Sequence, residues 1–214
     1  MIVQIPRRLT PYFINSIPSI LTLLAFFIAG IVNGQKYESI AIYNTQPAMP
    51  FGKFAELFTG RLHPGVEYGR GFTLSSKKSH DWFLELKGGY FFHRFVQHGI
   101  PAYVSAGYRY KFNSRFSAET SIGAGGMLSI PATGKYKLND NGEYENNKGI
   151  GRLQAIATYG IGGSYLVQPF AKKPIRVFAL YQQKLQFPFI KTYVPLLPYN
   201  SFMIGVTRSI TNTK

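Results

Sequence analysis

Long stretches of this sequence alternate between apolar and polar residues with a period of two, and this alternation restricts the fold more than any other feature. In segment 82–93 the even positions are mostly apolar, and the charged residues Glu85 and Lys87 fall on odd positions. A period of two places successive side chains on opposite faces of a β-strand. The pattern recurs, with all charges on the polar set, in the segments 102–112, 116–128, 152–165 and 175–187. The sequence therefore predicts an all-β protein.

If these strands close into a barrel, its size indicates which face of each strand points inward. A barrel of about eight strands has a lumen just wide enough for side chains. The glycine- and serine-rich polar set fits such a lumen, whereas a soluble barrel would have to pack the aromatic residues of the apolar set inside. We therefore expect a transmembrane antiparallel up-and-down β-barrel. Its lipid-facing aromatic girdle is predicted to consist of Trp82, Tyr90, Phe92, Tyr108, Tyr110, Phe112, Phe116, Tyr159, Tyr165, Tyr181 and Phe187.

The lengths of the connections predict the number of strands and their direction. The alternation marks seven strands, at 61–76, 82–94, 101–112, 115–130, 151–167, 174–187 and 199–210. Single-chain barrels have an even number of strands, short periplasmic turns and longer extracellular loops. An eighth strand within 36–58 satisfies both rules and makes the long connection 131–150 extracellular. Alternatively, residues 51–58 (FGKFAELF) form a short amphipathic helix against the membrane.

Residues 1–34 have the features of a secretory signal peptide. Arg7 and Arg8 are followed by the apolar run 21–32, and Gly34 is suited to cleavage before Gln35. The alternative is a membrane anchor, although the run is shorter than the ~20 residues that a spanning helix needs. We expect residues 35–214 to form the mature outer-membrane barrel.

The charge and the absence of cysteine exclude several classes of site. The formal net charge is +15, but no dense run of lysine and arginine indicates nucleic acid, so anionic headgroups and lipopolysaccharide phosphates are the expected partners. Without cysteine there is no disulfide, thiolate metal site or lipid-anchored cysteine. Asp140, Asn141 and Glu143 do not match the spacing of a calcium loop, and a hairpin turn is predicted there. No motif indicates a cofactor or a metal.

Charged residues and a histidine on the polar set are predicted to face the lumen. In a narrow lumen opposite charges must pair, because an isolated buried charge is costly. The predicted lumen charge network consists of His63, Glu67, Glu85, Lys87, Arg109, Lys111, Glu119, Arg176 and Lys184. One interpretation is a salt-bridged plug; the other makes His63 or His93 a base beside Glu67, Glu85 or Glu119. Ser79, His80 and Asp81 are adjacent residues and cannot form a triad, so no catalytic residue is assigned.

Three short segments carry a resemblance to a known family. They are Leu62-His63-Pro64-Gly65-Val66-Glu67-Tyr68-Gly69, then 89–93 (GYFFH), and then 107–112 (GYRYKF). Over residues 50–165 the chain resembles small outer-membrane β-barrel proteins of Bacteroidota-type Gram-negative bacteria. The resemblance implies this fold and outer-membrane localisation, and it implies no activity or site residues, because the family has no assigned function.

We therefore expect a non-enzymatic barrel that serves as a membrane scaffold or interaction module, including as an accessory subunit of a larger outer-membrane complex. Two alternatives stay open. One is a lipid A-modifying hydrolase or acyltransferase, which needs a base such as His63. The other is a narrow channel. The expected partners are outer-membrane lipids, lipopolysaccharide and other outer-membrane proteins.

Overall fold

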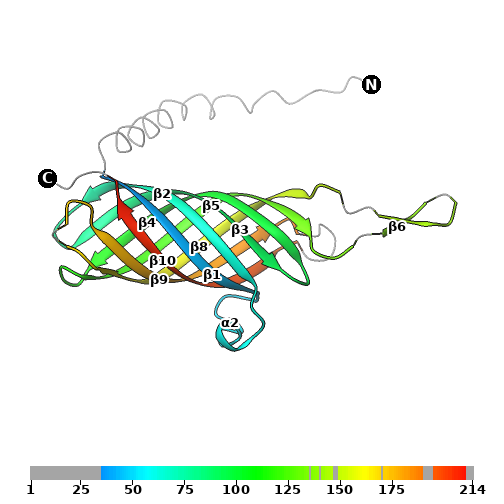
Figure 1. Cartoon of the computed structure of the whole chain (residues 1–214), viewed down its shortest axis with the longest axis horizontal. Helices are drawn as coiled ribbons and strands as arrows, with labels where there is room; N and C mark the ends of the chain where they lie inside the picture. The colour runs from blue at the N-terminus through cyan, green and yellow to red at the C-terminus, as the bar shows by residue number, and fades with distance from the viewer. Residues whose placement is uncertain are drawn as a thin grey trace, which may run out of the picture.

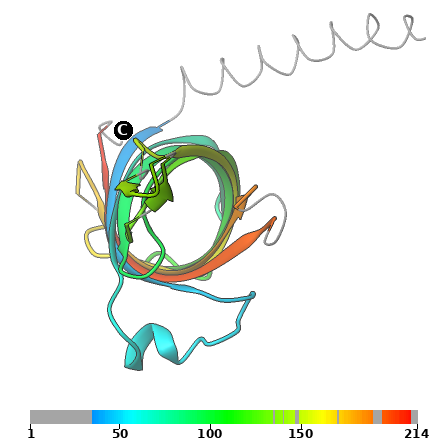
Figure 2. The same cartoon turned by 90° about the vertical axis from the view of Figure 1, so that its right-hand side faces the viewer.

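A computed structural model shows an antiparallel β-barrel closed by eight strands (Figures 1 and 2). It describes residues 35–134, 136–139, 141–146, 149–169, 171–189 and 195–210, so the predicted signal peptide lies outside the described residues. The barrel strands are β1 (Gln35–Pro47), β2 (Pro64–Ser76), β3 (His80–His93), β4 (Gln97–Lys111), β5 (Phe116–Pro131), β8 (Arg152–Leu166), β9 (Ile175–Phe187) and β10 (Leu197–Ser209). Each barrel strand pairs with the barrel strands that come before and after it along the chain, and β1 closes the barrel against β10.

The eighth strand that the connection lengths required is β1, which pairs with β2 from Gln35↔Thr73 to Asn44↔Pro64. A short helix, α2 (Glu56–Thr59), lies in the connection between β1 and β2. The eighth strand is therefore confirmed, whereas the alternative helix over 51–58 is present only in its last part, because residues 51–55 form turns. No helix among the described residues is long and apolar enough to cross a membrane.

The two ends of the barrel carry different sets of connections between the strands. At what we call the turn end, the strands are joined by residues 77–79, 112–115 and 167–174. At the loop end they are joined by 48–63, 94–96, 132–151 and 188–196. Connection 132–151 contains a hairpin of β6 (Tyr136–Leu138) and β7 (Tyr144–Asn146), which projects beyond the loop end in Figure 1. The predicted hairpin turn is thus confirmed.

The outer wall is apolar and the inner face is polar. Ile42, Leu86 and Ile122 are 61–66% exposed on the outside, whereas Glu67, Glu85 and Lys87 are at most 7% exposed. An exposed apolar belt around a closed sheet is stable in hydrocarbon, where every backbone group must be paired within the barrel. The fold is therefore a transmembrane β-barrel of the outer-membrane type.

Arg70 faces outward on β2, where a basic residue at the midplane of a membrane costs about 2–4 kcal/mol. Arg70 is directly opposite the outward-facing Glu38 on β1, so an acidic residue lies beside it on the same face. The pairing of β2 with β3 is regular around Arg70, and its one irregularity lies between Thr73 and Ser75.

The lumen also holds aromatic rings, which belong to the inward parity of the strands and were not assigned to the lumen from the sequence. Six of these rings lie opposite a glycine on the neighbouring strand, whereas Tyr199 lies opposite Lys184. The pairs are Tyr37–Gly71, Tyr43–Gly65, Phe83–Gly107, Phe91–Gly99, Tyr103–Gly125 and Phe178–Gly205. A Cβ atom at Gly71 would lie 2.1 Å from Cζ of Tyr37. The missing side chain on one strand therefore makes the space for the ring on the next.

Replacing one of these glycines should destabilise the barrel. Gly71→Ala places a methyl group inside the ring of Tyr37, and overpacking of this kind costs about 1–3 kcal/mol. Gly88→Ala is the matched control, because the nearest atom to its Cβ would be the Pro101 carbonyl oxygen at 3.9 Å. Urea titration of the barrel in lipid vesicles should show a lower midpoint for Gly71→Ala only. Equal midpoints would contradict the proposed role of the glycines.

Candidate functional site

The middle of the lumen contains a buried cluster of charged side chains from β2 and β3. The ammonium nitrogen of Lys87 lies 3.3 Å from Oε1 of Glu67 and 3.2 Å from Oε2 of Glu85. The hydroxyl of Tyr103 donates a hydrogen bond to Glu67 at 2.6 Å, and Gln182 donates to the Tyr103 hydroxyl at 2.9 Å. One cation thus holds two carboxylates across adjacent strands, and neutral side chains complete the hydrogen bonding.

A second cluster fills the lumen toward the turn end. Nε of Arg109 donates to Oε1 of Glu119 at 2.7 Å, and its NH1 lies 3.7 Å from Asp81. Asp81 also pairs with Lys111 at 2.6 Å. Arg176 donates to the hydroxyls of Ser117 and Ser164, at 3.2 Å each. Asp81 was not predicted as a lumen residue, although it shares the parity of Glu85 and Lys87 in β3.

Toward the loop end the lumen is filled mainly by amide side chains. Gln97 donates to Gln186 at 2.6 Å and to the Tyr199 hydroxyl at 3.0 Å, and Gln186 donates to Gln154 at 2.5 Å. These four residues are at most 5% exposed. This layer was not predicted because its members carry no charge, although the inward parity of these glutamines was the available signal.

Lys184 lies in the lumen without a carboxylate at salt-bridge distance among the described residues. Its ammonium nitrogen lies 5.4 Å from the ring centre of Tyr43 and 5.3 Å from that of Phe91. Cations are attracted to the faces of aromatic rings within about 6 Å. The inward-facing aromatic rings therefore do more than fill space, because they also contact a buried charge.

The two candidate basic residues, His63 and His93, stack on one another at the loop end. Their ring centroids are 3.7 Å apart with an interplanar angle of 13°. None of their four ring nitrogens has a hydrogen-bond partner among the described residues. Burial lowers the pKa of His63 below its ordinary value, because desolvation disfavours the charged ring. A general base needs an orienting group and a substrate proton in reach, and no carboxylate orients either ring here.

Two cavities in the lumen are small. One cavity of about 90 Å³ lies near the turn end, lined by residues that include Tyr37, Asp81, Arg109 and Arg176. Another of about 20 Å³ lies beside Glu85, Lys87 and Glu119. Sites for small molecules usually measure about 300–1,000 Å³. No group of three or more histidine, aspartate or glutamate residues that would suit a metal occurs in the described part of the chain.

The predicted girdle residues all occupy outward positions, and nine of the eleven form two groups. Trp82, Tyr108, Tyr110, Phe112, Phe116 and Tyr165 lie toward the turn end, and Tyr90, Phe92 and Phe187 lie toward the loop end. Tyr159 is 40% exposed near the middle of β8. Tyr181 differs from the prediction, because it faces outward but is only 7% exposed.

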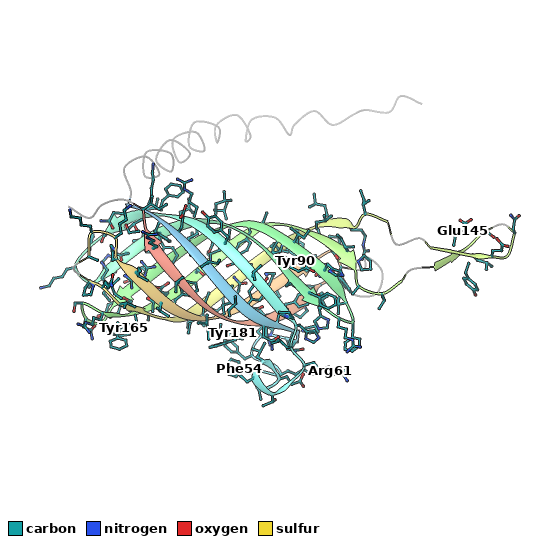
Figure 3. The ribbon with its side chains drawn as sticks, in the orientation of Figure 1. Phe54, Arg61, Tyr90, Glu145, Tyr165 and Tyr181 are labelled. Atoms are coloured by element: carbon teal, nitrogen blue, oxygen red, sulfur yellow. The ribbon has the colours of Figure 1, made fainter. Side chains whose placement is uncertain are left out.

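Tyr181 is covered by residues 48–60, which fold back against the outer wall and which we call the foot. Figure 3 shows Phe54 beside Tyr181, below the barrel wall. The ring of Phe51 stacks on Tyr181 with centroids 5.0 Å apart, and the ring of Phe54 lies 5.7 Å away. The foot therefore replaces lipid over this part of β9 and β10.

Outward-facing polar side chains on the wall hold the backbone of the foot. The amide of Asn200 donates to the carbonyls of Met49 and Gly52, at 3.0 and 2.5 Å, and it accepts from Tyr181. The Phe51 amide donates to the Tyr181 hydroxyl at 2.9 Å. Asn44 donates to the Leu57 carbonyl at 2.7 Å. Polar residues on the lipid-facing parity of β1, β9 and β10 were the sequence signal for the foot.

Two residues of the foot have left-handed backbone conformations. Phe51 has φ 57° and Lys53 has φ 52°. Residues other than glycine rarely adopt such angles, and bulky ones pay a steric cost that the surrounding contacts must offset. The Tyr181 contacts at Phe51 provide that compensation. The shape of the foot is therefore specified by the barrel wall.

Comparison with known proteins gives similar folds only. No family model and no curated protein matches the chain. Among solved structures, the chain is similar to the attachment invasion locus protein Ail of Yersinia pestis, with 14% identity over 83% of this chain and 99% of that chain, and a TM-score of 0.46. It is also similar to Neisserial surface protein A, with 11% identity over 80% of this chain and 95% of that chain, and a TM-score of 0.49. The N-terminal barrel of Pseudomonas aeruginosa OprF has 16% identity over 83% of this chain and 100% of that chain, and a TM-score of 0.38. Such values say nothing about function.

Removing the central cation should destabilise the barrel. Lys87→Met leaves Glu85 and Glu67 buried without their ion-pair partner, and breaking a buried pair in this way costs about 3–5 kcal/mol. Urea titration in vesicles, followed by the fluorescence of the single tryptophan, Trp82, measures the loss. The double variant Glu85→Gln, Lys87→Met should recover part of it, because a neutral amide replaces one of the two unpaired carboxylates. If Lys87→Met leaves the midpoint unchanged, the ion pairs do not stabilise the fold.

Proposed function

We propose that this protein is a non-enzymatic outer-membrane barrel of a Gram-negative bacterium, of the Bacteroidota-type family that its sequence resembles. In this proposal, residues 1–34 are a signal peptide that is removed on export, the turn end faces the periplasm and the loop end faces outward. The barrel acts as a membrane scaffold and interaction module, and it suits an accessory subunit of a larger outer-membrane complex.

The main support is that ion pairs, amides and aromatic rings fill the lumen. Lys87, Arg109 and Gln97 lie at successive levels, and each is bound to side chains from other positions of the wall. Such a lumen has a structural role and leaves the outer wall and the loops as the surfaces available to other molecules.

The two alternatives have less support. A lipid A-modifying enzyme needs a positioned base, and the buried rings of His63 and His93 have no orienting partner among the described residues. A channel needs a continuous path for water, and the cavities of about 90 and 20 Å³ lie between ion-paired side chains.

A filled lumen should not conduct ions. Protein reconstituted in a planar lipid bilayer should show no single-channel steps above the leak of the lipid alone, because hydrogen bonds of Gln97 to Gln186 and of Gln182 to Tyr103 join β4 to β9 across the lumen. A porin inserted in the same bilayer serves as the positive control. Reproducible unitary steps from the intact protein would favour the channel.

A scaffold in a complex should have protein neighbours in its native membrane. Crosslinking in intact cells, followed by extraction in mild detergent and purification through an affinity tag, should recover the barrel with the same outer-membrane proteins in repeated experiments. A tagged barrel of unrelated sequence is the control. Recovery of the lone barrel would reject the accessory-subunit role and leave the membrane scaffold.

A further inference from the structure

The foot presents apolar side chains away from the barrel. Met49, Phe51, Phe54 and Phe58 are 69%, 64%, 43% and 57% exposed, whereas Leu57 is buried against the wall at 4%. Figure 2, viewed along the barrel, shows α2 outside the ring of strands. Because the foot lies on the outer wall of a membrane barrel, these side chains project into the surroundings of the barrel and not into its lumen.

The backbone of the foot is paired to a degree that suits a lipid environment. Four successive amides, from Leu57 to Gly60, donate to carbonyls of residues 54–56. The wall residues Asn44, Tyr181 and Asn200 bind further backbone groups. Unpaired backbone groups are costly in hydrocarbon, whereas water would pair them without help from the wall. Five outward-facing polar side chains in a lipid-facing wall are explained by this pairing: Asn44, Gln46, Tyr181, Gln183 and Asn200.

Two arginines lie beside the foot at the loop end, and we call Arg61 and Arg94 the arginine pair. Both guanidinium groups approach the ring of Phe95, with their carbons 5.6 and 5.7 Å from its centroid. Neither arginine has a carboxylate at salt-bridge distance in the described part of the chain. In Figure 3 Arg61 and Phe54 both lie on the same outer side of the barrel. The foot itself carries an exposed ion pair, Lys53–Glu56 at 3.3 Å, so the uncompensated positive charge is at the arginine pair.

We propose that the foot and the arginine pair together bind a phosphorylated glycolipid of the lipid A type in the outer leaflet. The acyl chains pack against Met49, Phe51, Phe54 and Phe58, and a phosphate lies between Arg61 and Arg94. An apolar surface that lies beside a pair of unpaired guanidinium groups is complementary to an acyl chain attached to a phosphorylated headgroup. This inference rests on the proposed outward orientation of the loop end.

The depth of the foot tests the first half of the proposal. The chain has no cysteine, so Phe58→Cys can carry a single nitroxide label in vesicles of phosphatidylcholine and lipid A. The references are Ile122→Cys on the outer wall and Tyr144→Cys on the projecting hairpin, which are 65% and 77% exposed. The quantity measured is the ratio of the label's collision rate with oxygen to its collision rate with a water-soluble nickel complex. This ratio should be severalfold higher at position 58 than at position 144.

Met49→Cys repeats the measurement without removing a foot phenylalanine. A label at positions 49 and 58 that is as open to the nickel complex as position 144 would overturn the proposal, and so would a label shielded from both reagents, since protein would then cover the foot. Position 122 separates this outcome from failure of the membrane barrel itself. If position 122 is also open to the nickel complex, the barrel assignment fails; if it stays in lipid, only the foot inference fails.

The arginine pair is tested by lipid A retention. The double variant Arg61→Gln, Arg94→Gln should bind lipid A in detergent micelles about tenfold more weakly than the wild type. Lys77→Gln, Lys78→Gln is the matched control, because it removes the same charge from the turn end and should bind lipid A normally. Equal losses in both variants would indicate a general charge effect and overturn the site. Equal displacement of lipid A by phosphatidylglycerol would overturn the assignment of lipid A.

Discussion

The structure depends on filling a narrow lumen in which almost every polar group must find a partner. Lys87 lies between two carboxylates, Arg109 bridges Asp81 and Glu119, and the glutamines at the loop end bind one another. Separated from water, each of these groups would be costly alone. Because they are paired, the apolar side chains can occupy the outer face. This arrangement supports the proposals that the lumen does not conduct ions and that the outer surface contacts other molecules.

The foot follows the same rule on the other side of the wall. Asn44, Tyr181 and Asn200 face outward, where an unpaired polar group would be as costly as in the lumen. They are paired by the backbone of residues 48–60, which the wall in turn holds in an unusual conformation at Phe51 and Lys53. The barrel therefore has a mainly apolar outer wall, and the polar sector formed by Asn44, Tyr181 and Asn200 is covered by its own chain.

The strands could be predicted because alternation is a local property of the sequence. Even β1, where alternation is weaker, was required by the parity of the strand count and the connection lengths. The contents of the lumen were harder to predict, since they depend on register. Phe83 fits inside because Gly107 is its cross-strand partner, and neither residue alone indicates this. Tyr181 was placed correctly on the outer face, but its burial depends on how residues 48–60 fold, which strand periodicity does not describe.

The orientation of the wall is the central claim, and Trp82 tests it without any mutation, since it is the only tryptophan in the sequence. It is 51% exposed on the outer face of β3, next to the inward-facing Phe83. In vesicles whose lipids carry bromine on the acyl chains, its fluorescence should be strongly quenched, while aqueous acrylamide should have little effect. Strong quenching by acrylamide with no effect of bromine would mean that the ring does not face lipid, and the account of the barrel would be wrong.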